Sequence, residues 1–401
     1  MAAKLNKAIY IVAAKRTPFG SMGGTLRNQT PTDLGVIATI AALKQANLDP
    51  SLVDDIIFGN VSQTAKDTPY LARHVGIRSG MRLDTPGLTV NRLCGAGFES
   101  IMQGAKNIAM GESEIVACGG AENMSMAPYA LRDIRQGTKF PNDLTLEDSL
   151  WSALNDQYVK LPMALTAEKV GEQCGITREA CDTYALRSQH LWQAAQDAGR
   201  FKEEITPVMI KDKKKGEYAF EMDEHPRGGK ATIESLNKLP SMFKKNGLVT
   251  AGNASGISDG AGTVILASEE AVKKHNLTPL SRIVSYSAVG VDPTIMGYGP
   301  VPAVNNALKA AGLTMADLGQ IEINEAFAAQ YLACEKDLKI NPEITNLDGG
   351  AVAMGHPTGA SGSRIMGHLT YQLRANNIKY GVGSACCGGG QGIAIIIEKC
   401  Q

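Results

Sequence analysis

Apolar positions in the chain follow two alternating patterns, one spaced for helices and one made of short unbroken runs. In the first helical stretch the apolar residues stand at i, i+3, i+4 and i+7: Leu34, Ile37, Ala38 and Ala41. Thr32 or Asp33 is expected to cap this helix, because a side-chain oxygen there can accept a free backbone N–H. The helix should end near Asn47, and a longer helix is predicted over residues 178–198.

The unbroken apolar runs predict strands that are buried on both faces. They lie at residues 9–13, 56–58, 264–267 and 393–397. A strand with one face in water alternates apolar and polar residues, whereas a strand covered by helices on both sides does not. The two patterns together therefore predict a layered α/β protein.

An internal repeat divides the chain into two related halves. Residues 42–60 (ALKQANLDPSLVDDIIFGN) resemble residues 307–324 (ALKAAGLTMADLGQIEIN). The offset is 265 positions at the lysines (309 − 44) and 264 at the asparagines (324 − 60). Further pairs follow in the same order: 91–101 with 355–365, and 114–124 with 380–392. Matches at nearly one offset argue against chance similarity and predict two pseudo-symmetric core domains.

Residues 123–249 have no counterpart in the second half and are interpreted as an inserted third domain. The core domains are then expected at 1–122 with 250–272, and at 273–401. The insertion carries a lysine-rich run: Lys211, Lys213, Lys214 and Lys215. This run is either a solvated loop or a positive patch that attracts a phosphorylated ligand.

The composition excludes several classes of protein. The 401 residues include 40 Lys+Arg and 40 Asp+Glu, with 44% hydrophobic residues, which is typical of a globular chain and not of a disordered one. Balanced charge argues against a nucleic-acid partner, because such proteins normally carry a basic excess. No apolar run approaches the roughly 18 residues of a membrane span, so no span is expected.

The N-terminal segment is basic and free of acids until Asp33. Its charged residues are Lys4, Lys7, Lys15, Arg16 and Arg27. Such a segment is typical of mitochondrial targeting, but cleavage would remove the strand at 9–13. An uncleaved signal and a domain that simply begins basic both remain open.

Eight scattered cysteines show no C-x-x-C pair with a matching second pair, so neither a disulfide framework nor a zinc site is predicted. Most should be buried and inert. Cys94 differs, because it lies at a tight turn between a strand at 88–90 and a helix at 98–110. Gly95 and Gly97 should permit that turn and leave room above the sulfur. The helix N-terminus is expected to lower the pKa of the Cys94 thiol.

Three motifs of the second half carry further candidate residues. His356 lies in a glycine-rich loop (GHPTGASGSR), Asn324 ends a strand (NEAFA), and Cys386 precedes three glycines (SACCGGGQG). Because of the repeat, these motifs and Cys94 fall at equivalent ends of two related sheets and are expected to share one cleft. Two thiols, an imidazole and an amide favour acyl-thioester chemistry: one thiol is the nucleophile, His356 its activator and the other thiol an acid/base.

These motifs, over essentially the whole chain, resemble the thiolases, which cleave 3-ketoacyl-CoA or condense two acetyl-CoA. The quoted motifs are VAAKRTPFG, NRLCGAGFES, GGAENMS, NEAFA, GHPTGASGSR and SACCGGGQG. The stretches EDSLW (147–151) and LPMALTAE (161–168) resemble the mitochondrial 3-ketoacyl-CoA thiolases of fatty-acid oxidation. The resemblance implies a thiolase fold, with two pseudo-symmetric βαβαβ-type domains in an α-β-α-β-α arrangement and an inserted loop domain.

The resemblance also implies a role for each candidate residue. Cys94 would attack the 3-keto carbon, His356 would take its proton and donate to the enolate oxygen, and Asn324 would hold that oxygen through a water. Cys386 would protonate the departing acetyl-CoA carbanion. The backbone amides of Cys94 and Gly388 would bind the oxyanion of the tetrahedral intermediate.

The family binds CoA in the inserted domain, where Arg227 should lie near the nucleotide and Ser255 along the pantetheine channel. CoA is a substrate, and no metal or further cofactor is implied. The family forms dimers or tetramers, and a homotetramer built as a dimer of dimers is expected. The expected location is the mitochondrial matrix, with the cytoplasm as the alternative.

Three positions depart from the family pattern. Ala96 stands where most members have serine, Cys387 adds a second thiol beside Cys386, and residues 228–232 match poorly, with Ala231 where a threonine contact would be expected. Of the three, only the mismatch at residues 228–232 concerns the contacts that would hold the nucleotide.

Three other functions are weighed against a degradative thiolase acting on medium-chain substrates. An acetoacetyl-CoA thiolase would have the same residues and a narrower substrate. A β-ketoacyl synthase is disfavoured by Cys386 and NEAFA. A non-catalytic lipid or CoA carrier should have lost Cys94, His356 or Cys386, and all three are present.

Overall fold

The computed structural model describes residues 2–214 and 216–400, and its described strands include one mixed sheet of 11 strands. The first half of this sheet runs in the order β5-β4-β6-β13-β2 and the second in the order β14-β17-β16-β15. Their bounds are β2 (Ile9–Arg16), β4 (Asp55–Gly59), β5 (Gly87–Val90), β6 (Ile115–Asn123), β13 (Ser258–Ser268), β14 (Ser281–Gly290), β15 (Gln320–Ile323), β16 (Tyr380–Cys387) and β17 (Gln391–Lys399). The short strands β1 (Ala2–Lys4) and β3 (Gly20–Ser21) pair with β14 and β13.

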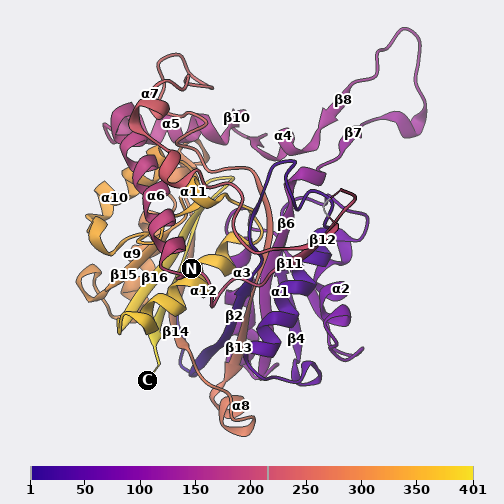
Figure 1. Cartoon of the computed structure of the whole chain (residues 1–401), viewed down its shortest axis with the longest axis vertical. Helices are drawn as coiled ribbons and strands as arrows, with labels where there is room; N and C mark the ends of the chain where they lie inside the picture. The colour runs from indigo at the N-terminus through magenta and orange to yellow at the C-terminus, as the bar shows by residue number, and fades with distance from the viewer. Residues whose placement is uncertain (1, 215, 401) are drawn as a thin grey trace.

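The helices of the two halves occupy three layers, as Figure 1 shows. The outer helices of the first half are α1 (Pro31–Gln45) and α2 (Leu71–Arg78), those of the second half are α9 (Pro300–Ala311) and α10 (Ala328–Leu338), and the central pair is α3 (Ala96–Met110) and α12 (Ser361–Ala375). The central pair contacts strands of both halves. The layer order is therefore α-β-α-β-α, as predicted.

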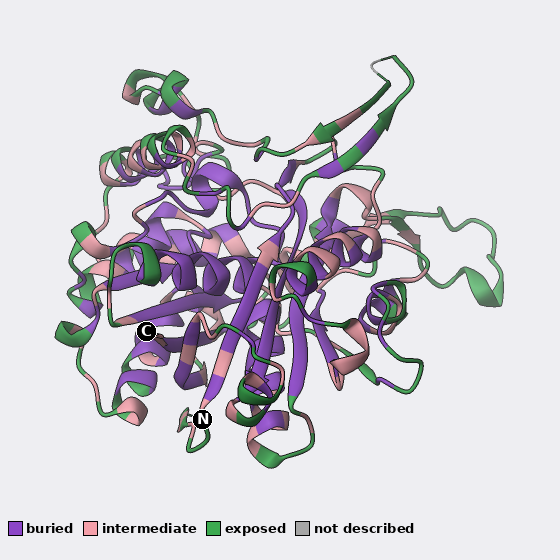
Figure 2. Ribbon diagram, turned by 60° about the horizontal axis from the view of Figure 1, so that its bottom comes forward, coloured by how far each residue is buried: buried purple, intermediate pink, exposed green. Residues whose placement is uncertain are grey.

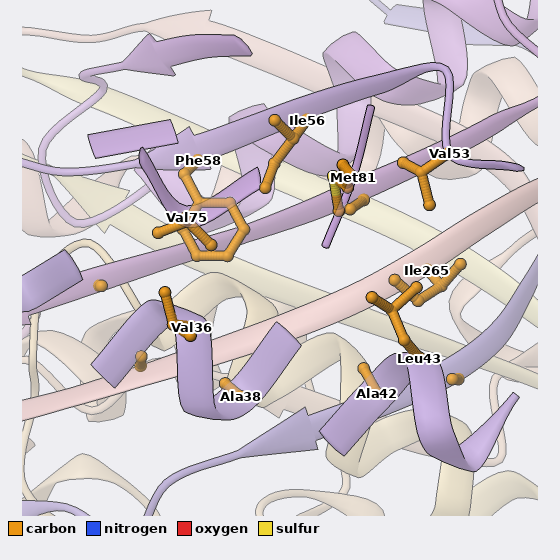
Figure 3. Close-up of a cluster of buried hydrophobic side chains, with 14 of the residues drawn as sticks. Val36, Ala38, Ala42, Leu43, Val53, Ile56, Phe58, Val75, Met81 and Ile265 are labelled. Atoms are coloured by element: carbon orange, nitrogen blue, oxygen red, sulfur yellow. The ribbon is translucent and has the colours of Figure 1, made fainter. Parts of the chain in front are cut away.

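Successive side chains of the strands enter different cores, which explains why the strands are apolar throughout. Ile56 and Phe58 of β4 pack against α1 and α2, as Figure 3 shows, whereas Ile57 packs in the central core with α3. In β17 the odd-numbered residues from Ile393 to Ile397 face the central core, and Ile396 faces α9. The predicted burial of both strand faces is confirmed.

The repeat is visible element by element. Helices α3 and α12 each span 15 residues and begin 265 positions apart (361 − 96). In the sheet, Gly59 of β4 pairs with Gly120 of β6, and Ile323 of β15 pairs with Ser384 of β16. Both of these pairs are related by 264 positions (323 − 59 and 384 − 120). The two halves thus share strand register as well as element order.

The start of α1 differs from the prediction. Neither Thr32 nor Asp33 is the N-cap; Thr30 is, and its hydroxyl accepts the backbone N–H of Asp33 at 3.0 Å. The Asp33 carboxylate accepts the Thr30 backbone N–H in return, forming a capping box. Proline at position 31 fits the first turn, because a backbone N–H there would have no partner within the helix. The helix therefore starts three residues before Leu34, the first residue of the apolar pattern.

The central helices cross at two glycines that the repeat makes equivalent, Gly97 of α3 and Gly362 of α12. A Cβ atom on Gly362 would lie 2.1 Å from the backbone nitrogen of Phe98, and one on Gly97 would lie 2.8 Å from the nitrogen of Ser363. Any larger residue would push the two helices apart. The crossing brings the first turn of each helix, and the loop before it, to one place.

The inserted segment packs over both halves and sends out one arm. Its bounds are β7 (Tyr129–Leu131), β8 (Leu146–Asp148), α4 (Ser149–Ala153), β9 (Asn155–Asp156), β10 (Leu161–Pro162), α5 (Met163–Gln173), α6 (Arg178–Asp197), β11 (Val208–Asp212), β12 (Gly216–Phe220) and α7 (Ile233–Asn237). Tyr184 of α6 joins the second-half core, and Val208 joins the first-half core. The exposed β7–β8 arm, labelled in Figure 1, projects from the body, and most of its residues are drawn in the green of exposed positions in Figure 2. The domain limits at 122, 249 and 272 stay a prediction.

The lysine-rich run lies on the β11–β12 hairpin. Lys211, Lys213 and Lys214 are exposed, and Lys215 lies outside the described residues. The large cleft described below is lined by other basic residues, so the described part of the run is a solvated turn.

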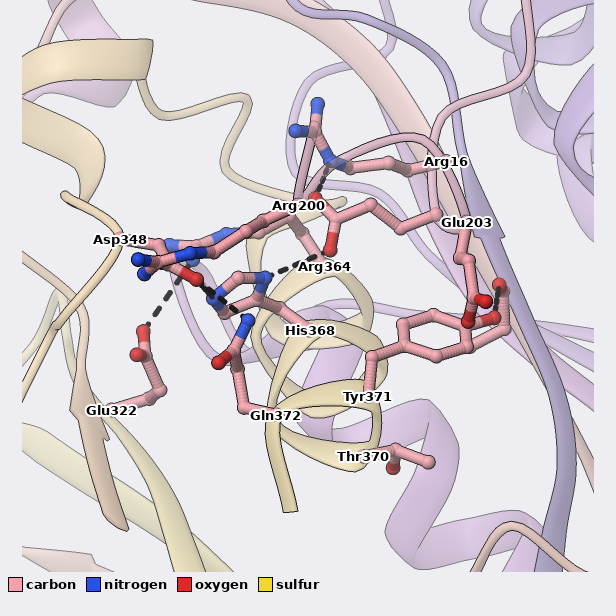
Figure 4. A network of polar contacts seen from close by, with 12 residues as sticks. Arg16, Arg200, Glu203, Glu322, Asp348, Arg364, His368, Thr370, Tyr371 and Gln372 are labelled. Carbon is pink, nitrogen blue, oxygen red and sulfur yellow. Dashed lines mark hydrogen bonds and ion pairs between the residues drawn. The ribbon is translucent and has the colours of Figure 1, made fainter. Parts of the chain in front are cut away.

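A buried charge network joins the insertion to the core, as Figure 4 shows in part. Arg16 of β2 donates hydrogen bonds to Glu204 at 2.8 Å and to Asp223 at 2.7 Å. His368 of α12 forms a hydrogen bond with the second carboxylate oxygen of Glu204 at 2.8 Å. Although burial disfavours the imidazolium, the carboxylates of Glu204 and Asp348 raise the pKa of His368 to about 10. Arg16 is therefore a buried structural residue and not a free N-terminal charge.

The crossing at Gly362 predicts the effect of adding one methyl group there. We expect Gly362→Ala to lower the midpoint of thermal unfolding by at least about 5 °C, because the new Cβ would overlap backbone atoms of α3. Gly229→Ala is the matched control, since a Cβ there meets nothing within 4 Å. Equal melting of the two variants would contradict the role given to the crossing.

Candidate active site

Cys94 lies in the turn between β5 and α3, as predicted. Leu93 before it adopts a left-handed backbone (φ 51°), and its N–H is held by the Asn91 side chain at 2.8 Å. A left-handed leucine is strained, so the turn is fixed by its surroundings. A backbone hydrogen bond from Gly388 reaches the Cys94 sulfur. The structure thus brings these two predicted residues together.

The expectation of a lowered pKa at Cys94 is wrong for the free enzyme. Burial raises the pKa of the Cys94 thiol to about 11, and the hydrogen bond from Gly388 only partly offsets this. Withdrawal from water destabilises the thiolate more than the backbone hydrogen bonds at the turn stabilise it. Cys94 is a neutral thiol at neutral pH, and it needs a base to become a nucleophile.

The two glycines beside Cys94 serve packing and not backbone freedom. Gly95 has φ −92°, which any residue adopts, and a Cβ on it would lie 2.6 Å from the Cys387 sulfur. Gly97 is needed at the helix crossing described above. The prediction that both leave room above the Cys94 sulfur is therefore corrected: they leave room for Cys387 and for α12.

His356 lies in the loop between α11 (Ala351–Met354) and α12, at the pseudo-symmetric place to the Cys94 turn. The Ser361 hydroxyl donates to the Pro357 carbonyl at 3.1 Å, so its oxygen accepts from His356 Nδ1 at 2.6 Å. The imidazole therefore carries its proton on Nδ1 and an unprotonated lone pair on Nε2. Burial, together with the charge of Arg364, lowers the pKa of His356 to about 4.

Asn324 follows β15 and connects the imidazole to the sheet. Its backbone N–H donates to the Ser384 carbonyl at 2.9 Å, and its side-chain Nδ2 donates to His356 Nε2 at 3.3 Å. The Asn324 Oδ1 atom is buried and has no hydrogen-bond partner among the described residues. An unpartnered buried oxygen fits the predicted use of this amide to hold a water.

Cys386 and Cys387 end β16 and point to opposite faces. Cys386 packs with Met296 and Ala326 at the site. Burial raises the pKa of Cys386 well above the usual value, and the nearby Cys94 thiol acts in the same direction. Cys387 lies in the central core instead. Cys386 is thus the thiol that shares the site with Cys94.

The predicted CoA residues lie at two places. Arg227 is exposed and lines a cleft of about 1410 Å³ together with His225, Lys230 and Ala231. Ser255 does not line this cleft; its N–H donates to the Ala326 carbonyl at 3.0 Å, beside the thiol site. Residues 251–252 line the cleft as well, so the segment that bears Ser255 leads from the cleft toward Cys386.

Two residues of the quoted motifs had no predicted role. Ser361 fixes the tautomer of His356, and Glu122 of GGAENMS accepts hydrogen bonds from the His356 loop, at 3.0 Å from both Thr358 and Gly359. The only signal in the sequence was an acid inside a glycine-rich strand end. In the described part of the chain no group of three or more His, Cys, Asp or Glu side chains could hold a metal ion.

Family models match both halves of the chain. The N-terminal domain of thiolase matches residues 9–270, and the C-terminal domain of thiolase matches residues 277–399. The chain belongs to the thiolase family. No helix among the described residues of this thiolase is long and apolar enough to cross a membrane.

The relatives within the family fall under two enzyme names, 3-ketoacyl-CoA thiolase and acetyl-CoA acetyltransferase. The mitochondrial 3-ketoacyl-CoA thiolase of Bos taurus is 56% identical over 98% of this chain and 99% of its own length. An acetyl-CoA acetyltransferase of Syntrophomonas wolfei is 42% identical over 98% of this chain and 100% of its own. A crystal structure of human mitochondrial 3-ketoacyl-CoA thiolase in complex with CoA matches with a TM-score of 0.97 and 55% identity, covering 99% of both chains.

The raised pKa of Cys94 predicts how its alkylation depends on pH. Because only the thiolate reacts, the rate of iodoacetamide labelling of Cys94 should still rise about tenfold per pH unit between pH 8 and 10. Peptide mass spectrometry must separate Cys94 from Cys174 and Cys400, the other half-buried thiols. A rate that levels off near pH 7 would show instead that the helix N-terminus governs the thiol.

Proposed function

We propose that this thiolase cleaves 3-ketoacyl-CoA with CoA, giving acetyl-CoA and an acyl-CoA shortened by two carbons, as in fatty-acid β-oxidation. The observation that carries the proposal is the pairing of Asn324 with His356 and of Cys94 with Cys386 at the ends of the neighbouring strands β15 and β16, in a chain 56% identical to a 3-ketoacyl-CoA thiolase. The reaction is reversible and runs as a Claisen condensation in the other direction.

In the first half-reaction Cys94 attacks the 3-keto carbon while His356 Nε2 takes its proton. The low pKa of His356 keeps Nε2 unprotonated until then. The oxyanion is held by the N–H groups of Cys94 and Gly388. The bond between the second and third carbons then breaks, and the Cys386 thiol protonates the acetyl-CoA carbanion, whose enolate oxygen is held by His356 and by a water on Asn324.

In the second half-reaction CoA regenerates the enzyme. The CoA thiol gives its proton to the Cys386 thiolate and attacks the acyl group on Cys94. The tetrahedral intermediate expels the Cys94 thiolate, which recovers its proton from His356. Both thiols and the imidazole end in their starting states. CoA is the only cosubstrate, and no metal or redox cofactor takes part.

CoA would lie along the cleft that contains Arg227, with its pantetheine arm passing Ser255 toward Cys94. The cleft volume of about 1410 Å³ and its basic lining at Arg227 and Lys230 support a phosphorylated ligand. The CoA complex of the human relative supports the same ligand class. Ala231 also lines the cleft, and it lacks the hydroxyl with which a threonine at this position would contact the ligand.

We further propose a homotetramer built as a dimer of dimers. Strand β5 pairs only with β4 among the described strands and exposes Leu88 at its edge, which fits pairing with a second copy. The projecting arm exposes large apolar side chains, which mark a contact surface: Tyr129, Leu131, Ile134, Phe140, Leu144 and Leu146.

The proposed location is the mitochondrial matrix, with the cytoplasm as the alternative. The bovine and human relatives are named as mitochondrial enzymes, and the N-terminal segment of this chain is basic. Because β1 pairs with β14 and β2 lies inside the sheet, this segment is part of the fold. An uncleaved targeting signal is compatible with both observations.

Thiolysis rates on substrates of different length test the proposed function. Wild type should consume 3-ketoacyl-CoA with free CoA at chain lengths of four carbons and above. Cys94→Ser should lose at least about a thousandfold in rate, as expected for a nucleophile. Cys400→Ser, which changes a half-buried thiol just after the far end of β17, should retain activity. Activity confined to four carbons would favour the acetoacetyl-CoA thiolase, and no turnover would favour a carrier.

A further inference from the structure

The active site has a pseudo-symmetric counterpart in the first half of the chain. Strand register places Asn60 after β4 where Asn324 follows β15, and Glu122 on β6 where Cys386 lies on β16, each pair separated by 264 positions (324 − 60 and 386 − 122). The two pairs therefore occupy equivalent places in the two halves, and only the second pair carries a thiol. An acid at the equivalent place calls for its own explanation.

Glu122 is fully buried and accepts five hydrogen bonds from two segments. The segment after β4 donates from the Asn60 side chain at 3.2 Å and from the N–H groups of Val61 and Ser62 at 3.0 Å each. The His356 loop donates from the Thr358 hydroxyl and the Gly359 N–H, again at 3.0 Å each. One carboxylate thus ties the first-half sheet to the loop of the second half that carries the base.

The surroundings leave this loop little room to take another position. A Cβ on Gly120 would lie 1.9 Å from the Gly359 carbonyl oxygen, so the loop packs directly on β6. Burial raises the pKa of Glu122 to about 7 in spite of the hydrogen bonds. Burial therefore destabilises the ionised form of Glu122. A buried acid that is kept in spite of this cost is expected where its hydrogen bonds serve a purpose.

We propose that Glu122 is a positioning residue that holds the Thr358–Gly359 turn, and with it His356, in place beside Cys94. The first-half position that is equivalent to Cys386 thus anchors the active-site loop of the second half. The carboxylate makes no hydrogen bond to either thiol among these contacts, although its charge adds to the raised pKa of Cys94. It positions His356 through the loop. This role rests on the proposed acyl transfer by Cys94, because His356 is positioned for that step.

The most selective test removes one contact and leaves the carboxylate in place. Thr358→Val keeps the side-chain volume but removes the hydroxyl that donates to Glu122, and Thr358→Ser keeps the hydroxyl. We expect Thr358→Val to lower kcat for thiolysis by about tenfold or more with KM for CoA within about twofold, and Thr358→Ser to recover most of that kcat. Equal kcat in wild type and Thr358→Val would overturn the proposal.

Glu122→Gln provides the second arm. It should lower kcat at least as far as Thr358→Val, and the double variant should be no slower than Glu122→Gln alone, because both changes release one anchor. Asp54→Asn is the matched control, a carboxylate at the opposite end of β6 that accepts the N–H groups of Glu114 and Ile115. It should leave kcat unchanged. Additive losses in the double variant, or a loss in melting temperature without a loss in kcat, would contradict an anchor.

Cys94 alkylation separates this inference from the proposed function. If wild type fails to cleave 3-ketoacyl-CoA, the proposed function is wrong, and the anchor is then judged by iodoacetamide labelling alone. A changed rate of Cys94 labelling in Thr358→Val relative to Thr358→Ser would support the anchor, because the turn at Gly359 packs against the start of α3 directly after Cys94. Equal labelling in the two variants would reject it, and this arm remains available even if Glu122→Gln does not fold.

Discussion

The crossing of α3 and α12 at Gly97 and Gly362 is the contact on which the rest of this structure depends. In the described part of the chain, these two helices pack against strands of both halves and also carry a site loop at their first turn. Because neither glycine has a side chain, the Cys94 turn and the His356 loop approach each other. One catalytic site is thereby assembled from two copies of one fold. The equivalent position in the first half, Glu122, is left for the positioning role proposed above.

The protonation states of the site residues follow from the exclusion of water at this crossing. Burial keeps Cys94 and Cys386 as neutral thiols and keeps His356 as a neutral imidazole, with its proton held on Nδ1 by Ser361. In the proposed mechanism, charge is therefore created only when a substrate supplies an oxyanion for the Gly388 amide to stabilise. A low dielectric then strengthens each hydrogen bond to the developing charge. The free enzyme avoids a reactive thiolate, and acyl transfer still has a base in place.

The sequence revealed the layered fold because each unbroken apolar strand, such as 393–397, requires cover on both faces, and the repeat fixed the pairing of the halves. The positions of Cys94, Asn324, His356 and Cys386 followed from motifs at strand ends. The pKa of Cys94 did not, because desolvation depends on distant segments that pack around it. Glu122 was missed for the same reason: its five donors come from segments about 60 and 240 positions away, and such contacts leave no local pattern.

Locating the acyl group after reaction with 3-ketoacyl-CoA in the absence of free CoA tests the central claim most directly. If one thiol of the shared site is the nucleophile and the other moves only protons, peptide mass spectrometry should find the shortened acyl group on Cys94 and none on Cys386 or Cys387. With Cys386→Ala, cleavage of 3-ketoacyl-CoA should fail, and acyl-CoA should acylate Cys94 more slowly, because Cys386 also protonates the departing CoA. An acyl group on Cys386, or turnover without acylated Cys94, would contradict this division of roles.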